Sequence, residues 1–201
     1  MSTTVEMWFD PACPWAWITS RWLLEVQQVR DVELIFKVMS LGVLNEGRDL
    51  AEDYRRFLDT ESWIGARAAA GVAETGDQAL LARFYTALGT RYHQNREPKQ
   101  VNTVRAALVE VGADPTIADQ AQGDAFDSSL RASHAEAIAA VGDQVGTPVI
   151  RVNAVALFGP VLSPAPKGEQ AGALFDGFVT MAAYPGLFEL KRSRTVGPIL
   201  D

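Results

Sequence analysis

The sequence predicts an α/β fold whose single sheet is built from two separated parts of the chain. Three observations lead to this prediction. A strand, helix, strand pattern occupies residues 5–39, and a long, almost entirely helical stretch follows from about residue 50 to 141. Strand patterns then return at residues 149–158, ahead of a last helix. The order is therefore βαβ, helical insertion, ββα.

The first segment is a parallel βαβ unit. Val5, Met7 and Phe9 alternate with their neighbours at the period of a short strand. A helical stretch runs from about residue 14 to 30, and residues 32–39 form a second alternating, β-branched segment. Strand, helix and strand at this spacing predict a right-handed crossover between parallel strands.

The middle and last segments complete the fold. One apolar helix face in the middle is formed by Val101, Val104, Leu108 and Val111. Residues 149–152 and 155–158 flank Asn153-Ala154 as a hairpin, and a helix is expected over about 168–184. We therefore expect a thioredoxin-like core from residues 1–49 and 142–201, with an α-helical subdomain inserted at 50–141.

Composition narrows the classes of partner. The formal net charge of -7 disfavours nucleic acid or an anionic membrane as a partner, and the basic run Lys191–Arg194 is interpreted as a solvated tail. The N-terminus lacks the pattern of a signal peptide, and no apolar stretch is long enough to span a bilayer. A single cysteine cannot form an internal disulfide. We expect a soluble, cytoplasmic protein, either monomer or homodimer.

The one cysteine, Cys13, stands where a strand ends and a helix begins. Unpaired amides and the helix dipole stabilise an anion there, so we expect a lowered thiol pKa and a nucleophilic thiolate. Pro14 suits the first helical turn, because its missing N–H would have no partner in any case. The alternative, a buried structural cysteine, fits this position less well.

The segment Phe9–Trp17 resembles the active site of the DsbA-like branch of the thioredoxin superfamily, where Asp-x-x-Cys-Pro-Trp-Cys opens the first core helix. Members of that branch carry a helical insertion and a cis-proline opposite the cysteine. Gly146-Thr147-Pro148, just before a predicted strand, matches that second signature. The resemblance implies that Cys13 is the nucleophile and that Pro14, Thr147 and Pro148 contact the substrate or thiol.

Further motifs resemble the actinobacterial mycothiol-dependent nitroreductases: residues 17–22, 38–41, 44–46, 158–162 and 188–192. The resemblance implies a thiol-disulfide oxidoreductase with mycothiol as co-substrate and no tightly bound cofactor. Its second partner would be a disulfide or a small aromatic, such as a nitroaromatic, acceptor.

Ala16 departs from the family pattern, because relatives carry a resolving cysteine at that position. Alanine cannot attack a mixed disulfide on Cys13. Two explanations stay open: a natural monothiol enzyme whose adduct is resolved by an external thiol, or an engineered variant that traps the adduct.

The positions of other side chains along the sequence suggest their roles. Trp15 is expected to line the substrate surface and Trp17 to pack in the core. His93 is interpreted first as a helix-terminal cap, with a role facing the thiol as the alternative, which makes it a weaker candidate for binding the substrate or thiol. Asn45 and Tyr54 are weaker candidates for binding the thiol or an aromatic substrate. Cysteine and histidine spacing predicts no metal site.

Two alternative functions remain. The first is a kappa-type glutathione transferase or related isomerase, although those enzymes typically carry serine at the nucleophile position. The second is a non-catalytic module that holds peptides in the groove between core and insertion.

Overall fold

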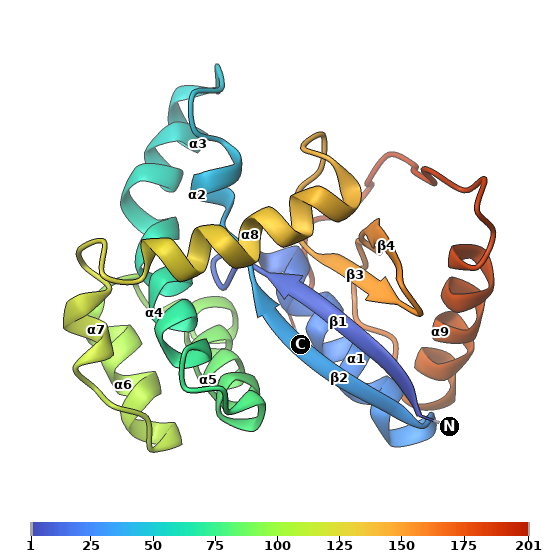
Figure 1. Cartoon of the computed structure of the whole chain (residues 1–201), viewed down its shortest axis with the longest axis horizontal. Helices are drawn as coiled ribbons and strands as arrows, with labels where there is room; N and C mark the ends of the chain where they lie inside the picture. The colour runs from blue at the N-terminus through green and yellow to red at the C-terminus, as the bar shows by residue number, and fades with distance from the viewer. Residues whose placement is uncertain (1, 201) are drawn as a thin grey trace.

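A computed structural model describes residues 2–200. The sheet consists of β1 (Thr3–Phe9), β2 (Val32–Val38), β3 (Val149–Val152) and β4 (Val155–Phe158). Helix α1 (Pro14–Val29) connects β1 to β2, and α9 (Gly168–Ala182) follows β4. The predicted α/β fold class, a thioredoxin-like core with the order βαβ and ββα, is confirmed (Figure 1).

The strand order is β2-β1-β3-β4. β1 pairs with β2 in parallel and with β3 antiparallel, and β3 pairs antiparallel with β4. The hairpin turn is Asn153-Ala154, as predicted, and both residues have positive φ (48° and 72°). Such angles are those of a tight turn that matches the twist of the strands.

Between β2 and β3 the described chain forms helices only. They are α2 (Leu41–Leu44), α3 (Glu52–Phe57), α4 (Trp63–Ala73), α5 (Gln78–Gly89), α6 (Val101–Val111), α7 (Ile117–Gln120) and α8 (Asp127–Val141). Two π-helical turns, η1 (Leu58–Ser62) and η2 (Thr90–Gln94), were not predicted. In this structure no helix within residues 2–200 has the length and apolarity needed to cross a membrane.

The sheet has helices on both faces, with α8 crossing in front of it and α1 behind, while α9 stands beside β4 and packs against α1 (Figure 1). Alternation along β1 divides the core accordingly. Met7 belongs to the main hydrophobic cluster, whereas Trp8 joins a small cluster with Met39 and Val149. Each face of β1 is therefore buried by a different layer of the fold.

The inserted helices and the sheet share the main hydrophobic cluster. Phe9 of β1 stacks on Tyr85 of α5, with ring centroids 3.7 Å apart, and Trp17 of α1 meets Tyr85 edge-on at 5.8 Å. Trp17 is fully buried, as predicted. Packing of this kind fixes the start of α1 relative to the insertion.

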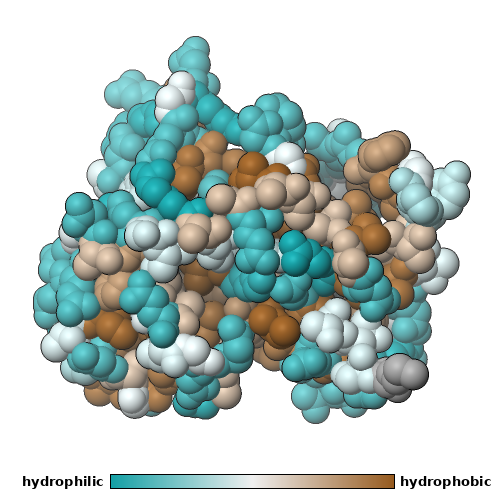
Figure 2. Space-filling model, viewed as in Figure 1, coloured by the Kyte–Doolittle hydropathy of each residue, from teal (hydrophilic) through white to brown (hydrophobic). Residues whose placement is uncertain are grey.

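Exposed hydrophobic side chains are concentrated in the last third of the chain. In Figure 2 brown residues are spread over the visible face, and one group of them lies at the upper right, on the side of β4 and α9. The exposed hydrophobic side chains of this part of the chain include Phe158, Tyr184, Phe188 and Leu190.

Candidate active site

The candidate site is built around Cys13, the N-cap residue of α1. The turn after β1 is closed by a hydrogen bond from the Cys13 N–H to the Asp10 carbonyl (3.0 Å). Pro14 is the first residue of the helix, as predicted, and the Ala16 N–H donates to the Cys13 Sγ at 3.5 Å. The sulfur thus occupies the place of the side-chain acceptor that normally caps a helix.

The segment before β3 brings Thr147 and Pro148 to the thiol. The Thr147–Pro148 peptide bond is cis, and the Cys13 thiol donates to the Thr147 carbonyl at 3.5 Å. The Thr147 hydroxyl accepts the Asp10 N–H at 3.3 Å. Two segments more than 130 residues apart in the sequence therefore form one site.

The structure contradicts the expectation of a lowered pKa for Cys13. The side chain is only 5% exposed, and burial raises its pKa to about 12. The Ala16 N–H acts in the opposite direction, and the nearby Asp10 carboxylate adds to the rise. The cost of burying the thiolate outweighs what the helix N-terminus contributes, so Cys13 rests as a neutral thiol.

Asp10 is a site residue that the sequence analysis did not single out. It is completely buried, and its carboxylate accepts the Ala12 N–H (2.8 Å) and the Leu41 N–H (2.7 Å). Burial raises the pKa of Asp10 to about 6, against the lowering effect of those two bonds. Its place in an Asp-Pro turn just before the cysteine was the available sequence signal.

The interpretation of His93 as a helix-terminal cap is wrong. The ring is buried, and its Nε2 bonds to the Pro11 carbonyl at 2.9 Å, so it holds the turn before Cys13 instead. Burial lowers the pKa of His93 to about 4, although the bond to Pro11 acts in the opposite direction. His93 is therefore a neutral donor at physiological pH.

Asn45 and Tyr54 lie on the same side of the site. Asn45 is the buried C-cap of α2 and donates to the Leu41 carbonyl at 2.8 Å, while Tyr54 of α3 is 39% exposed. Burial raises the pKa of Tyr54; charge on Cys13 or Asp10 adds to the rise, and the Asn45 amide opposes it. Of the two predicted binding residues, Tyr54 is thus electrostatically linked to the thiol.

Trp15 is half-buried beside the thiol, in the first turn of α1. The Arg194 guanidinium lies over its ring, 4.9 Å from the centroid. Residues 191–194 are exposed, as the interpretation of a solvated tail expects, and Arg194 makes this one ring contact as well. Trp17, by contrast, packs so closely against Gly89 of α5 that a Cβ at that glycine would overlap its ring.

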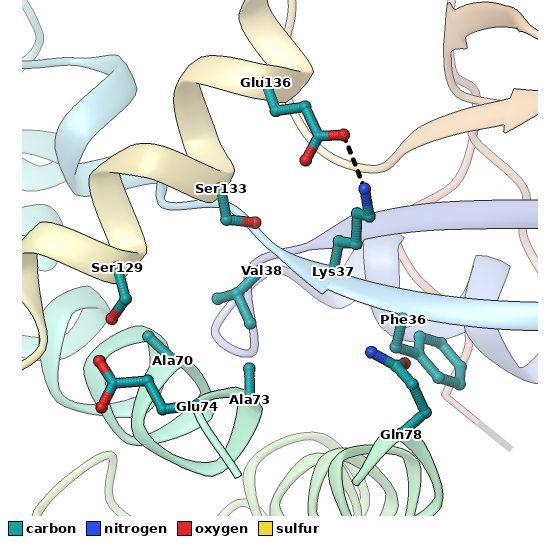
Figure 3. A pocket seen from close by; sticks show the side chains of 10 residues that line it. All are labelled: Phe36, Lys37, Val38, Ala70, Ala73, Glu74, Gln78, Ser129, Ser133 and Glu136. Atoms are coloured by element: carbon teal, nitrogen blue, oxygen red, sulfur yellow. Dashed lines mark hydrogen bonds and ion pairs between the residues drawn. The ribbon is translucent and has the colours of Figure 1, made fainter. Parts of the chain in front are cut away.

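A surface hollow of about 240 Å³ lies elsewhere, between α8, β2 and the helices α4 and α5 (Figure 3). Figure 3 shows Glu136 paired with Lys37 at one edge of it and Glu74 at another. None of the predicted site residues lines this hollow. Within residues 2–200, no cluster of three metal-binding side chains is present.

The thioredoxin-like core, the inserted helices and a thiol at the start of α1 opposite a cis-proline define a thioredoxin-fold protein of the DsbA type. A family model described as mycothiol-dependent nitroreductase, Rv2466c-like, matches residues 12–192. The chain belongs to this Rv2466c-like family, which confirms the resemblance seen in the sequence.

A relative in sequence and two solved structures are similar to this chain over most of its length. An uncharacterized protein of Mycobacterium tuberculosis, Rv2286c, is 31% identical over 195 residues, 96% of this chain and 83% of the relative. The oxidoreductase DsbA of Xylella fastidiosa has a TM-score of 0.57 at 19% identity, over 89% of this chain and 85% of that one. A 2-hydroxychromene-2-carboxylate isomerase has a TM-score of 0.62 at 14% identity, over 89% and 94%. These two structures are similar to the chain in fold.

Proposed function

We propose that the protein catalyses thiol–disulfide exchange with Cys13 as the nucleophile and mycothiol as the electron-donating thiol. The observation that carries this proposal is the Cys13 Sγ, held at the first turn of α1, 3.5 Å from both the Ala16 N–H and the Thr147 carbonyl. Membership of a family described as mycothiol-dependent supports the choice of thiol.

The exchange has two steps. The Cys13 thiolate attacks one sulfur of a disulfide, forms a mixed disulfide, and expels the other sulfur as a thiolate. A mycothiol thiolate then attacks the mixed disulfide, leaves as a disulfide, and returns Cys13 to its reduced form. The Ala16 N–H stabilises negative charge on Sγ when it attacks and when it leaves.

Ala16 makes the second step intermolecular. Its side chain is fully buried one turn from Cys13 and offers no nucleophile. As the chain stands, release of the adduct requires an external thiol, and we propose that it works as a monothiol enzyme. Loss of the Cys13 adduct should therefore depend on thiol concentration.

A nitroaromatic acceptor fits the same scheme. Cys13 and one mycothiol would together supply two electrons and two protons, which convert a nitro group to a nitroso group and water. The Cys13–mycothiol disulfide that results is then reduced by a second mycothiol. Trp15 and Tyr54, both near the thiol, would bind the aromatic ring.

The experiment is to incubate the reduced protein with mycothiol disulfide and to locate any adduct by mass spectrometry. An adduct on Cys13 that is removed by added mycothiol supports the proposal. The Cys13→Ser variant serves as the control and should form none. An unmodified wild-type protein, with no turnover of a disulfide or nitroaromatic substrate, would contradict it. Because Cys13 rests as a thiol, the rate of adduct formation should still be rising above pH 8.5.

A further inference from the structure

The segment after α9 turns back over the molecule rather than extending away from it (Figure 1). Ser163 anchors it with two hydrogen bonds: its hydroxyl donates to the Gly197 carbonyl and accepts the Ile199 N–H, both at 2.9 Å. Leu200 then packs, partly buried, against the hydrophobic core. The basic part of the segment is therefore held between α9 and these anchors.

This placement brings Arg194 close to the thiol site. Its guanidinium lies over Trp15, two residues from Cys13 in the sequence. Burial raises the pKa of Cys13, and the Arg194 charge is close enough to act in the opposite direction. Two separate observations, a ring contact and an electrostatic effect on the thiol, place this cation beside the nucleophile.

Within the part of the chain that the structure describes, Arg194 forms no ion pair. Its ring contact uses one face of the guanidinium and leaves the N–H groups at its edge for a ligand. The match to the family model ends at residue 192, so Arg194 lies outside the matched residues.

We propose that Arg194 is a specificity-determining residue that selects acceptors bearing a negative charge next to the bond that Cys13 attacks. The acceptor class is an aromatic disulfide or nitroaromatic compound with a carboxylate. The carboxylate pairs with the guanidinium while the aromatic ring lies at the site formed with Trp15. This inference rests on the proposed function of Cys13 and extends it to the substrate.

The test compares two chromogenic disulfides of similar size. Dithiobis(nitrobenzoate) carries two carboxylates, and dithiodipyridine is neutral. In each reaction the Cys13 thiolate attacks one sulfur, the S–S bond breaks, and the electron pair leaves on the other half as a coloured thiolate or thione. Cys13 is the only cysteine, so the colour reports a single site. The measured quantity is the ratio of the two rate constants.

Arg194→Gln should lower that ratio by about three- to tenfold, as expected for loss of one charge near the reacting group in a partly aqueous site. Arg194→Lys should retain most of the ratio, and high salt should reduce the wild-type preference. Arg192→Gln, which removes an exposed charge from the same segment, is the matched control and should leave the ratio unchanged.

A segment that merely covers the site would change both rate constants equally. An equal ratio in wild type and Arg194→Gln therefore overturns the role of Arg194 while leaving Cys13 exchange intact. If neither disulfide reacts with Cys13 in any variant, the proposed exchange function fails, and the acceptor preference fails with it.

Discussion

Trp8 and Trp15 both lie beneath cationic side chains, but the charges around them are arranged differently. Over Trp8, the Lys37 ammonium is 4.9 Å and the Arg151 guanidinium 4.8 Å from the ring centroid. The Glu6 carboxylate accepts from both cations, at 2.8 and 2.7 Å. Glu136 of α8 pairs with the same two cations, at 2.7 and 3.6 Å, so two cations and two carboxylates join β1, β2, β3 and α8 and neutralise one another.

Over Trp15 there is one guanidinium, that of Arg194, and within residues 2–200 no carboxylate pairs with it. The reactive group near this guanidinium is the Cys13 thiol, and the charge of Arg194 acts to lower the pKa of that thiol. A neutralised cluster stabilises the fold, whereas an unneutralised cation beside a nucleophile is available to a ligand. Four predictions test this difference, from the largest expected effect to the smallest.

The largest effect is expected for a substitution next to Trp15, on the lifetime of a mixed disulfide at Cys13. Ala16→Cys would place a second thiol one turn from Cys13 and make release of the adduct intramolecular. The lifetime of a Cys13 mixed disulfide at millimolar external thiol should fall by about a thousandfold or more. Mass spectrometry of quenched samples measures it. Ala16→Ser, which adds a similar volume without a thiol, should leave the lifetime unchanged; if it shortens the lifetime equally, access rather than resolution is responsible.

The turn that leads to Cys13 contains two buried groups whose titrations oppose each other. The pKa of Asp10 is raised to about 6, so its contribution to stability is present below about pH 4 and is lost as pH rises through 6. The pKa of His93 is lowered to about 4, so its contribution is present above about pH 6.5 and is lost as pH falls through 4. Each change amounts to about 3 kcal/mol, and in the wild type they largely cancel.

A variant that lacks one of these two groups should show the pH dependence caused by the other. The free energy of unfolding of Asp10→Asn should rise from pH 4 to 6.5, and that of His93→Gln should fall from pH 4 to 6. Urea unfolding at a series of pH values measures both slopes. Two variants with the same slope as the wild type would show that neither group titrates in this range.

The aromatic packing under the site should tolerate little change. Gly89→Ala puts a methyl group into the Trp17 ring and should lower the free energy of unfolding by about 1–3 kcal/mol. Gly177→Ala, in α9 with open space around its Cβ position, is the matched control and should be neutral or slightly stabilising. Thermal unfolding followed by circular dichroism distinguishes them. Equal melting temperatures would mean that Trp17 can move aside.

The smallest effect on the free energy of unfolding is expected for a substitution in the charged group around Trp8. Glu6→Gln removes the carboxylate shared by Lys37 and Arg151 and should destabilise the fold by about 1 kcal/mol at neutral pH. Burial alone would raise the pKa of Glu6, but the two cations outweigh burial and hold it below its usual value. The stability difference should therefore be present above the usual pKa of a glutamate and disappear as pH falls through the lowered pKa of Glu6. Disulfide exchange at Cys13 should be unaffected; a reduced exchange rate would show that the two tryptophan regions are coupled.

Much of the fold was predictable because local patterns determine it. Alternation in β1 and the proline at the start of α1 fixed the position of Cys13 as the N-cap residue. The Asn153-Ala154 turn and the cis peptide bond at Thr147–Pro148 were also expected from short motifs. Each of these features depends on residues that are neighbours in the sequence.

What was missed depends on tertiary packing. The pKa of Cys13 is raised because the folded chain buries it, with Thr147 of a distant segment in contact, and no local pattern reports that burial. The contact of His93 with Pro11 spans 82 residues. Arg194 contacts Trp15, which is far from it in the sequence, from a segment that Ser163 anchors. A helix N-terminus predicts a thiolate only where the thiol also keeps access to water.

The two hydrogen bonds of Ser163 have a consequence for how such a protein can diversify. They fasten the last residues to a loop after β4, and the nucleophile itself belongs to α1. Sequence changes in the terminal segment can therefore alter which acceptors are preferred without disturbing the residues that carry out the exchange. Grafting this short segment, together with the Ser163 loop, onto a related scaffold would transfer the preference as a module.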